Sequence, residues 1–169
     1  GPGPSDYSVA VETWDGSAWT TAPNSLPTGV GQNRGFGTSA AGVSCGGLFP
    51  GTGKNATTNE WDGSAWATGG AMNIDRAEFT AGMGTQTAGL VTGGWDDSSN
   101  MSSSEGYDGT AWSTRPSLAT ARQGAAGLGF GSVSTAGLVA GGATPPRTDA
   151  TEEFTGETTA ANYKTITTS

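Results

Sequence analysis

The residues of this chain best suited to ligand chemistry stand together at Trp95, Asp96 and Asp97. They open WDDSSNMSSSEG, the longest insertion-like stretch of the sequence. A tryptophan beside two carboxylates can stack on a sugar ring and hydrogen-bond its hydroxyl groups, or offer oxygen ligands to Ca²⁺. Arg147 and Asp149 supply a polar pair in a second loop, so we take Trp95, Asp96, Asp97 and Arg147 as candidate ligand-binding residues. The alternative is a solvated loop with Trp95 folded onto a neighbouring sheet.

Catalysis is limited by the residue types that the chain lacks. It contains no histidine and one cysteine, Cys45. Without histidine there is no conventional catalytic triad and no histidine-based metal site. Cys45 has no histidine as its base, and the equivalent positions hold Thr92 and Ala140, so we expect a small buried strand residue. The sequence therefore predicts a non-enzymatic protein with no cofactor and no bound copper or zinc.

The sequence is built of an internal repeat. WDGSAW at 14–19 returns at 61–66 and, as YDGTAW, at 107–112, and a degenerate fourth copy follows. The leading aromatic residues, at steps of 47, 46 and 47 residues, are Trp14, Trp61, Tyr107 and Phe154. A glycine pair recurs in phase with them: Gly46–Gly47, Gly93–Gly94 and Gly141–Gly142. An arginine recurs at Arg76 and Arg122, whereas the nearest arginine in the first copy is Arg34. Landmarks that keep one period indicate a repeat architecture.

The aromatic phrase predicts a β-hairpin. Pairing Trp14 with Trp19 leaves Gly16–Ser17 as a two-residue loop, and glycine first suits a type II′ turn. This register places both indoles on one face, where such cross-strand pairs stabilise a sheet. The other register, with Asp–Gly as a type I′ loop, separates the indoles. We prefer the first register and expect positive φ at Gly16, Gly63 and Gly109.

The glycine-pair phrase predicts a second hairpin in each repeat. AGLVTGG is a short apolar strand closed by glycines, FTAGMGT is its partner, and Gln86–Thr87 is the turn between them. Glycines in strands mark close backbone approach or a bulge. No stretch keeps a helical spacing of apolar residues. One repeat is thus four short antiparallel strands in an all-β fold.

The periodic acidic residues are expected to serve structure. Asp15, Asp62 and Asp108 are predicted to accept hydrogen bonds within their own turns. Four glutamates precede the aromatic phrases and are expected to face outward or to pair with the repeat arginine: Glu12, Glu60, Glu105 and Glu153.

This pattern resembles the kelch repeat over nearly the whole chain. In that family the glycine pair ends the second strand, the aromatic residue lies in the third and a tryptophan lies in the fourth. The resemblance assigns the first two roles to the glycine pairs and leading aromatics named above, and the fourth-strand tryptophan to Trp19, Trp66 and Trp112. It implies β-propeller blades. The first copy lacks an arginine in register, and the last lacks its tryptophan. Kelch-type copper-radical oxidases need histidine, so this chain cannot assemble their site.

Composition narrows the partners that we expect. The net charge is −8, and there is no basic stripe to neutralise phosphates, so we expect no nucleic acid. The same charge disfavours an anionic membrane surface, and no apolar run approaches the roughly 20 residues that span a bilayer. Gly, Ser, Thr and Ala enrichment resembles kelch-like proteins of phage tail fibres and virions. A virion or extracellular location follows as an expectation.

The strand count predicts an incomplete set of blades. We expect about three and a half blades in one domain, 1–169: an orphan outer hairpin at 8–21 and blades at 35–68, 79–114 and 124–168. Such a set exposes a strand edge. It is either part of a longer kelch chain or is completed by other subunits, in a homo-oligomer or larger particle. We expect a structural or adhesive protein; the alternative is a lectin-like module for cell-surface glycans.

Overall fold

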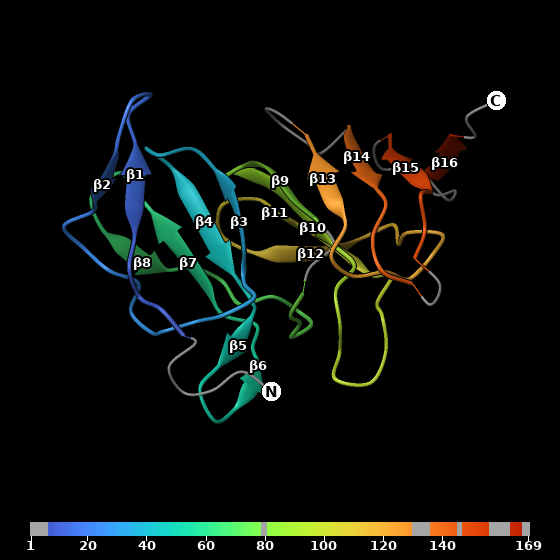
Figure 1. Cartoon of the computed structure of the whole chain (residues 1–169), viewed down its shortest axis with the longest axis horizontal. Helices are drawn as coiled ribbons and strands as arrows, with labels where there is room; N and C mark the ends of the chain where they lie inside the picture. The colour runs from blue at the N-terminus through green and yellow to red at the C-terminus, as the bar shows by residue number, and fades with distance from the viewer. Residues whose placement is uncertain (1–6, 79–80, 130–135, 145–146, 156–162, 167–169) are drawn as a thin grey trace.

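The computed structural model describes residues 7–78, 81–129, 136–144, 147–155 and 163–166 (Figure 1). Every regular element in these residues is a β-strand, which confirms the all-β prediction. No helix in this part of the chain is long and apolar enough to span a bilayer.

Within the described residues, the strands form three four-stranded antiparallel sheets and two separate hairpins. Sheet 1 contains β3 (Arg34–Gly37), β4 (Gly42–Cys45), β7 (Thr58–Trp61) and β8 (Trp66–Thr68). Sheet 2 contains β9 (Ala81–Thr85), β10 (Ala88–Thr92), β11 (Ser104–Tyr107) and β12 (Trp112–Arg115). Sheet 3 contains β13 (Ala126–Leu128), β14 (Gly137–Ala140), β15 (Thr151–Phe154) and β16 (Tyr163–Ile166). These sheets correspond to the three predicted four-stranded units.

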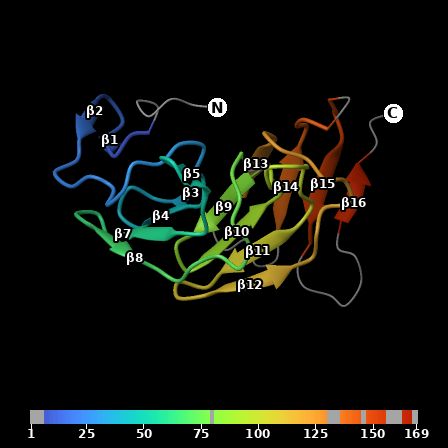
Figure 2. The same cartoon turned by 90° about the horizontal axis from the view of Figure 1, so that it is seen from below.

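Two further strand pairs lie outside these sheets. The first hairpin, β1 (Glu12–Trp14) and β2 (Trp19–Thr21), is the predicted orphan and forms a two-stranded sheet of its own. The second, β5 (Leu48–Phe49) and β6 (Gly53–Lys54), was not predicted and lies within the loop after Gly46–Gly47. The sheets follow one another in chain order, and the described residues do not close into a barrel (Figure 2).

The aromatic hairpins have the predicted register. The paired residues are Trp14 with Trp19, Trp61 with Trp66, and Tyr107 with Trp112. The first central turn residues have positive φ: Gly16 at 103°, Gly63 at 95° and Gly109 at 95°. Each turn is closed by its aspartate, as where Asp62 Oδ1 accepts from Ser64 N at 2.8 Å and Ala65 N at 2.7 Å. These N–H groups lower the pKa of Asp62, because they stabilise its charged form.

The fourth copy keeps this register although it lacks tryptophan. Phe154 of β15 pairs with Tyr163 of β16, so an aromatic residue still stands opposite the leading aromatic. The intervening residues, 155–162, outnumber the four of the other copies, which hides the pairing from a search at fixed spacing.

Two apolar cores lie between successive sheets. Between sheets 1 and 2 lie Val43, Cys45, Met72, Val91, Tyr107 and Trp112. Between sheets 2 and 3 lie Ala81, Met83, Leu90, Leu118, Ala125, Val139 and Phe154. Each sheet thus buries its faces mainly against its neighbours in the chain, as in other repeat proteins.

Strands of successive sheets pack directly against one another, with glycine at the contact. A Cβ atom on Gly127 of β13 would lie 2.1 Å from Cβ of Ala81 on β9. A Cβ atom on Gly89 of β10 would lie 2.2 Å from the ring of Phe36 on β3. The prediction that strand glycines mark close approach is therefore confirmed at these positions.

We expect Gly63→Val to destabilise the chain by about 1–3 kcal/mol, because valine is strained at a φ of 95°. Ala65→Val, two residues away and also exposed, should stay within about 0.5 kcal/mol. Urea unfolding of the two variants, followed by tryptophan fluorescence, measures both. Equal losses would contradict the role assigned to the turn glycine.

Candidate functional site

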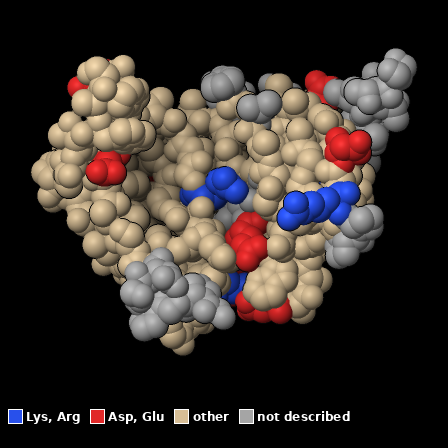
Figure 3. Space-filling view, viewed as in Figure 1, with Lys and Arg blue, Asp and Glu red and all other residues tan. Residues whose placement is uncertain are grey.

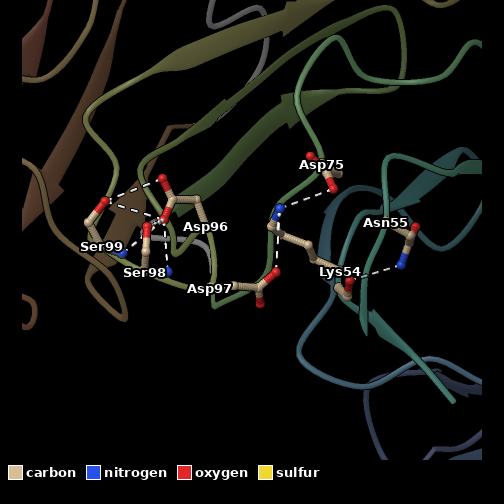
Figure 4. A network of polar contacts seen from close by, with 8 residues as sticks. Lys54, Asn55, Asp75, Asp96, Asp97, Ser98 and Ser99 are labelled. Carbon is tan, nitrogen blue, oxygen red and sulfur yellow. Dashed lines mark hydrogen bonds and ion pairs between the residues drawn. The ribbon is translucent and has the colours of Figure 1, made fainter. Parts of the chain in front are cut away.

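Asp96 is engaged by its own loop. Its Oδ1 accepts hydrogen bonds from the Ser98 hydroxyl at 2.7 Å, Ser98 N at 3.0 Å and Ser99 N at 2.8 Å (Figure 4). The Ser98 hydroxyl and these N–H groups lower the pKa of Asp96 to about 2. The arrangement repeats that of the aspartates in the aromatic turns, so the carboxylate serves the backbone here.

Asp97 lies near Lys54, which belongs to the loop after Gly46–Gly47 of sheet 1. Lys54 Nζ, at the end of β6, lies 3.5 Å from Asp97 and 3.2 Å from Asp75 (Figure 4). The hydrogen bond with Asp75 raises the pKa of Lys54. Both carboxylates are about half exposed, so each pair contributes at most about 1 kcal/mol. The contact ties the loops that follow the first two glycine pairs.

Trp95 and Arg147 occupy different surroundings. Trp95 is half-buried, and its backbone exchanges hydrogen bonds with Ala77 at 2.9 and 3.3 Å. Arg147 is exposed and forms no hydrogen bond or ion pair with residues 95–97 of the described chain. Trp95, Asp96 and Asp97 thus share a loop, and Arg147 does not complete a site with them. Ligand binding at Trp95 stays a prediction.

No group of three or more Cys, Asp or Glu side chains is placed to hold a metal ion among the residues that the structure describes. Cys45 is buried on β4, as predicted, with its Sγ 3.6 Å from the Arg34 carbonyl oxygen. Burial raises the pKa of the Cys45 thiol to about 12, so it is protonated at neutral pH.

The repeat arginine joins consecutive sheets. The Arg76 carbonyl accepts from Gly47 N, the end of sheet 1, at 2.9 Å. Its buried guanidinium enters sheet 2, where Nη1 donates to the carbonyls of Gly93 at 3.1 Å and Ser103 at 2.8 Å, and Nη2 to Glu105 at 2.7 Å. Burial lowers the pKa of Arg76, and Glu105 opposes that shift.

Arg122 forms the same joint between sheets 2 and 3. Its carbonyl accepts from Gly94 N at 3.0 Å. Its Nη1 donates to the carbonyls of Gly141 at 3.0 Å and Ala150 at 2.9 Å, and its Nη2 binds Glu152. Arg76 and Arg122 are both fully buried. We call each such arrangement an arginine joint.

The glutamate prediction needs correction. Glu105 pairs with Arg76, as one of the two expectations had it. In the next copy Arg122 pairs with the buried Glu152 and not with Glu153. The pairing position is two residues before the aromatic residue, whereas Glu60 and Glu153 lie one residue before it. Glu60 instead accepts a hydrogen bond from the Tyr107 hydroxyl of sheet 2.

The first hairpin is joined to sheet 1 without an arginine. A backbone bridge pairs Gly31 with Leu48, and the equivalent bridge one repeat later pairs Ala77 with Trp95. Val30 precedes Gly31 as Arg76 precedes Ala77, so Val30 occupies the position of the repeat arginine. Val30 is buried. Asn59 occupies, in sheet 1, the position that Glu105 and Glu152 hold in the other two sheets. Arg34, on β3, is not the equivalent residue, and the buried Val30 stands where the other two links have an arginine.

A comparison with models of known protein families finds no match, and a comparison with curated protein sequences finds no relative.

The aromatic pairs differ sharply in exposure. In sheet 2, Tyr107 and Trp112 are buried against sheet 1, and Trp112 Nε1 donates to Thr58 Oγ1 at 2.9 Å and to the Gly70 carbonyl at 3.0 Å. In the first hairpin, Trp14 is 48% exposed and Trp19 65% exposed. The same two-residue motif is therefore a sheet-to-sheet contact in one place and an uncovered surface in another.

Proposed function

We propose that this chain is a non-enzymatic structural or adhesive protein built of kelch-like blades, which works by assembling with other protein subunits. The observation that carries the proposal is the exposed pair Trp14 and Trp19 on a hairpin whose strands, among those described, pair only with each other. Burying a large apolar side chain stabilises by about 1.5–3 kcal/mol, and an open strand edge invites pairing with another chain. Covering this hairpin would therefore stabilise an assembled form.

The setting that we propose is a virion, as a tail-fibre or decoration protein, or an extracellular surface. Its support is composition: 30 of 169 residues are glycine and only 13% are charged. The face in Figure 3 is accordingly mostly uncharged. The glycan-binding alternative rests on Trp95, and because Asp96 serves its own turn, we place assembly first.

The double substitution Trp14→Ser and Trp19→Ser is expected to lower the native mass of the assembled protein, because it removes the exposed indoles without touching the three sheets. Light scattering coupled to size exclusion measures this mass at micromolar concentration. Ile74→Ser, at another exposed apolar residue, is the matched control and should leave the mass unchanged. Deleting residues 1–21 should give the same loss with β-sheet circular dichroism retained. A wild-type protein that is monomeric alone and captures no subunit would contradict the proposal.

A further inference from the structure

A groove of about 600 Å³ separates the first hairpin from sheet 1. One wall contains β1, and the other contains Phe36, Val43, Trp61 and Trp66. In Figure 3 the surface is hollowed between the left-hand part, where β1 and β2 lie, and the centre. Trp66 lines the groove, and its buried indole N–H has no hydrogen-bond partner in the described residues. The groove is therefore mainly apolar, and the Trp66 N–H lies buried behind its wall.

β1 corresponds to the third strand of a four-stranded sheet, but no second strand pairs with it among the described residues. In sheet 2 the third strand pairs with the second, Glu105 with Val91 and Tyr107 with Gly89. Sheets 1 and 3 repeat this pairing. Among the described strands, β1 pairs with β2 alone. The space beside β1, against sheet 1, is the place that an inner hairpin fills in the other sheets.

The carboxylate of Glu12 indicates that an inner hairpin placed beside β1 should carry a positive charge. It lies two residues before Trp14, the position at which Glu105 and Glu152 are buried against an arginine. The Glu12 side chain is exposed and forms no hydrogen bond or ion pair with the described residues, although its backbone belongs to the β1–β2 pair. In the arginine joints, this arginine stands just before the inner hairpin.

We propose that the groove receives an inner β-hairpin of the same repeat type from a partner polypeptide, with the arginine that precedes it paired to Glu12. The inference rests on the proposed assembly role. Strand addition supplies backbone hydrogen bonds to β1, and the apolar wall selects small and aromatic side chains. The described inner hairpins of this chain are already paired with their own outer hairpins, so an intact second copy is not the donor.

The chain's own sequence provides the probe. Residues 73–94, NIDRAEFTAGMGTQTAGLVTGG, contain the arginine and inner hairpin of the second repeat and can be fused to a soluble carrier. We expect this peptide to bind the full chain, to change its tryptophan fluorescence and to protect the β1 amides from hydrogen exchange. A scrambled peptide of the same composition is the control.

Charge exchange tests the pairing. Glu12→Arg should weaken binding about tenfold or more, because it sets two cations together, and Arg76→Glu in the peptide should restore binding to that variant. Thr13→Arg, on the neighbouring residue of β1, is the matched control and should not show this reversal. Failure of the peptide to bind, or binding indifferent to the exchange, would overturn the inference. If the mass of the wild-type chain still shows assembly, the proposed function survives that failure.

Discussion

Arg76→Val is expected to lower the free energy of unfolding by about 3–5 kcal/mol, because it leaves the Glu105 carboxylate buried without its cation. It also removes two hydrogen bonds that close the end of sheet 2, those to the carbonyls of Gly93 and Ser103. Folded domains are stable by only about 5–15 kcal/mol, so such a loss is large. Chemical denaturation followed by tryptophan fluorescence measures it. Arg147→Val, at an exposed arginine, should cost less than about 0.5 kcal/mol.

The first repeat supplies the compensating change. Val30 and Asn59 occupy the two positions there, so Arg76→Val with Glu105→Asn copies a pair that this fold already accepts. The double variant should be more stable than Arg76→Val alone, since no carboxylate is then left buried. Additive losses in the double variant would show that the carboxylate left without its cation is not the source of the cost.

Gly127→Val is the second change with a large expected effect, about 3 kcal/mol or more. The β-carbon alone would lie 2.1 Å from Cβ of Ala81 and 3.0 Å from its Cα, and a strand backbone cannot yield as a long side chain can. Overpacking of a core by smaller amounts already costs about 1–3 kcal/mol. The midpoint of thermal unfolding should fall accordingly.

Ala126→Val is the control for this contact, because Ala126 is exposed on the same strand. Valine suits a strand, so the change should be close to neutral. If both variants unfold at the wild-type temperature, β13 does not pack against β9 as described.

The hairpins could be predicted because their signals are local. Asp62, Gly63 and the flanking tryptophans fix the turn within six residues, and the fold realises that register. The ion pair between Arg76 and Glu105 spans 29 residues and was one of the two arrangements expected for the glutamates. Spacing alone, however, pointed to Glu153 where the structure uses Glu152. Strand periodicity contained the missing information: Glu105 and Tyr107 share a face, as do Glu152 and Phe154.

The candidate ligand residues were chosen for their chemical types, and their partners were not visible in sequence. Asp96 precedes Ser98 and Ser99, so its carboxylate closes a local turn. Asp97 meets Lys54, which is brought near by the β5–β6 hairpin. That hairpin has only two residues in each strand, too few for a pattern of alternating residues to indicate it.

The presence of Val30 in place of an arginine has a mechanical consequence. Two arginine joints link sheets 1, 2 and 3 in series. In each joint the guanidinium forms an ion pair with one sheet, and the backbone carbonyl of the same arginine accepts a hydrogen bond from the sheet before it. The link between the first hairpin and sheet 1 has valine in that place, backed by a few backbone bonds and the bond from Asn24 Nδ2 to the Ser64 carbonyl. When the chain is pulled, the hairpin should detach first, while the three sheets continue to carry the load.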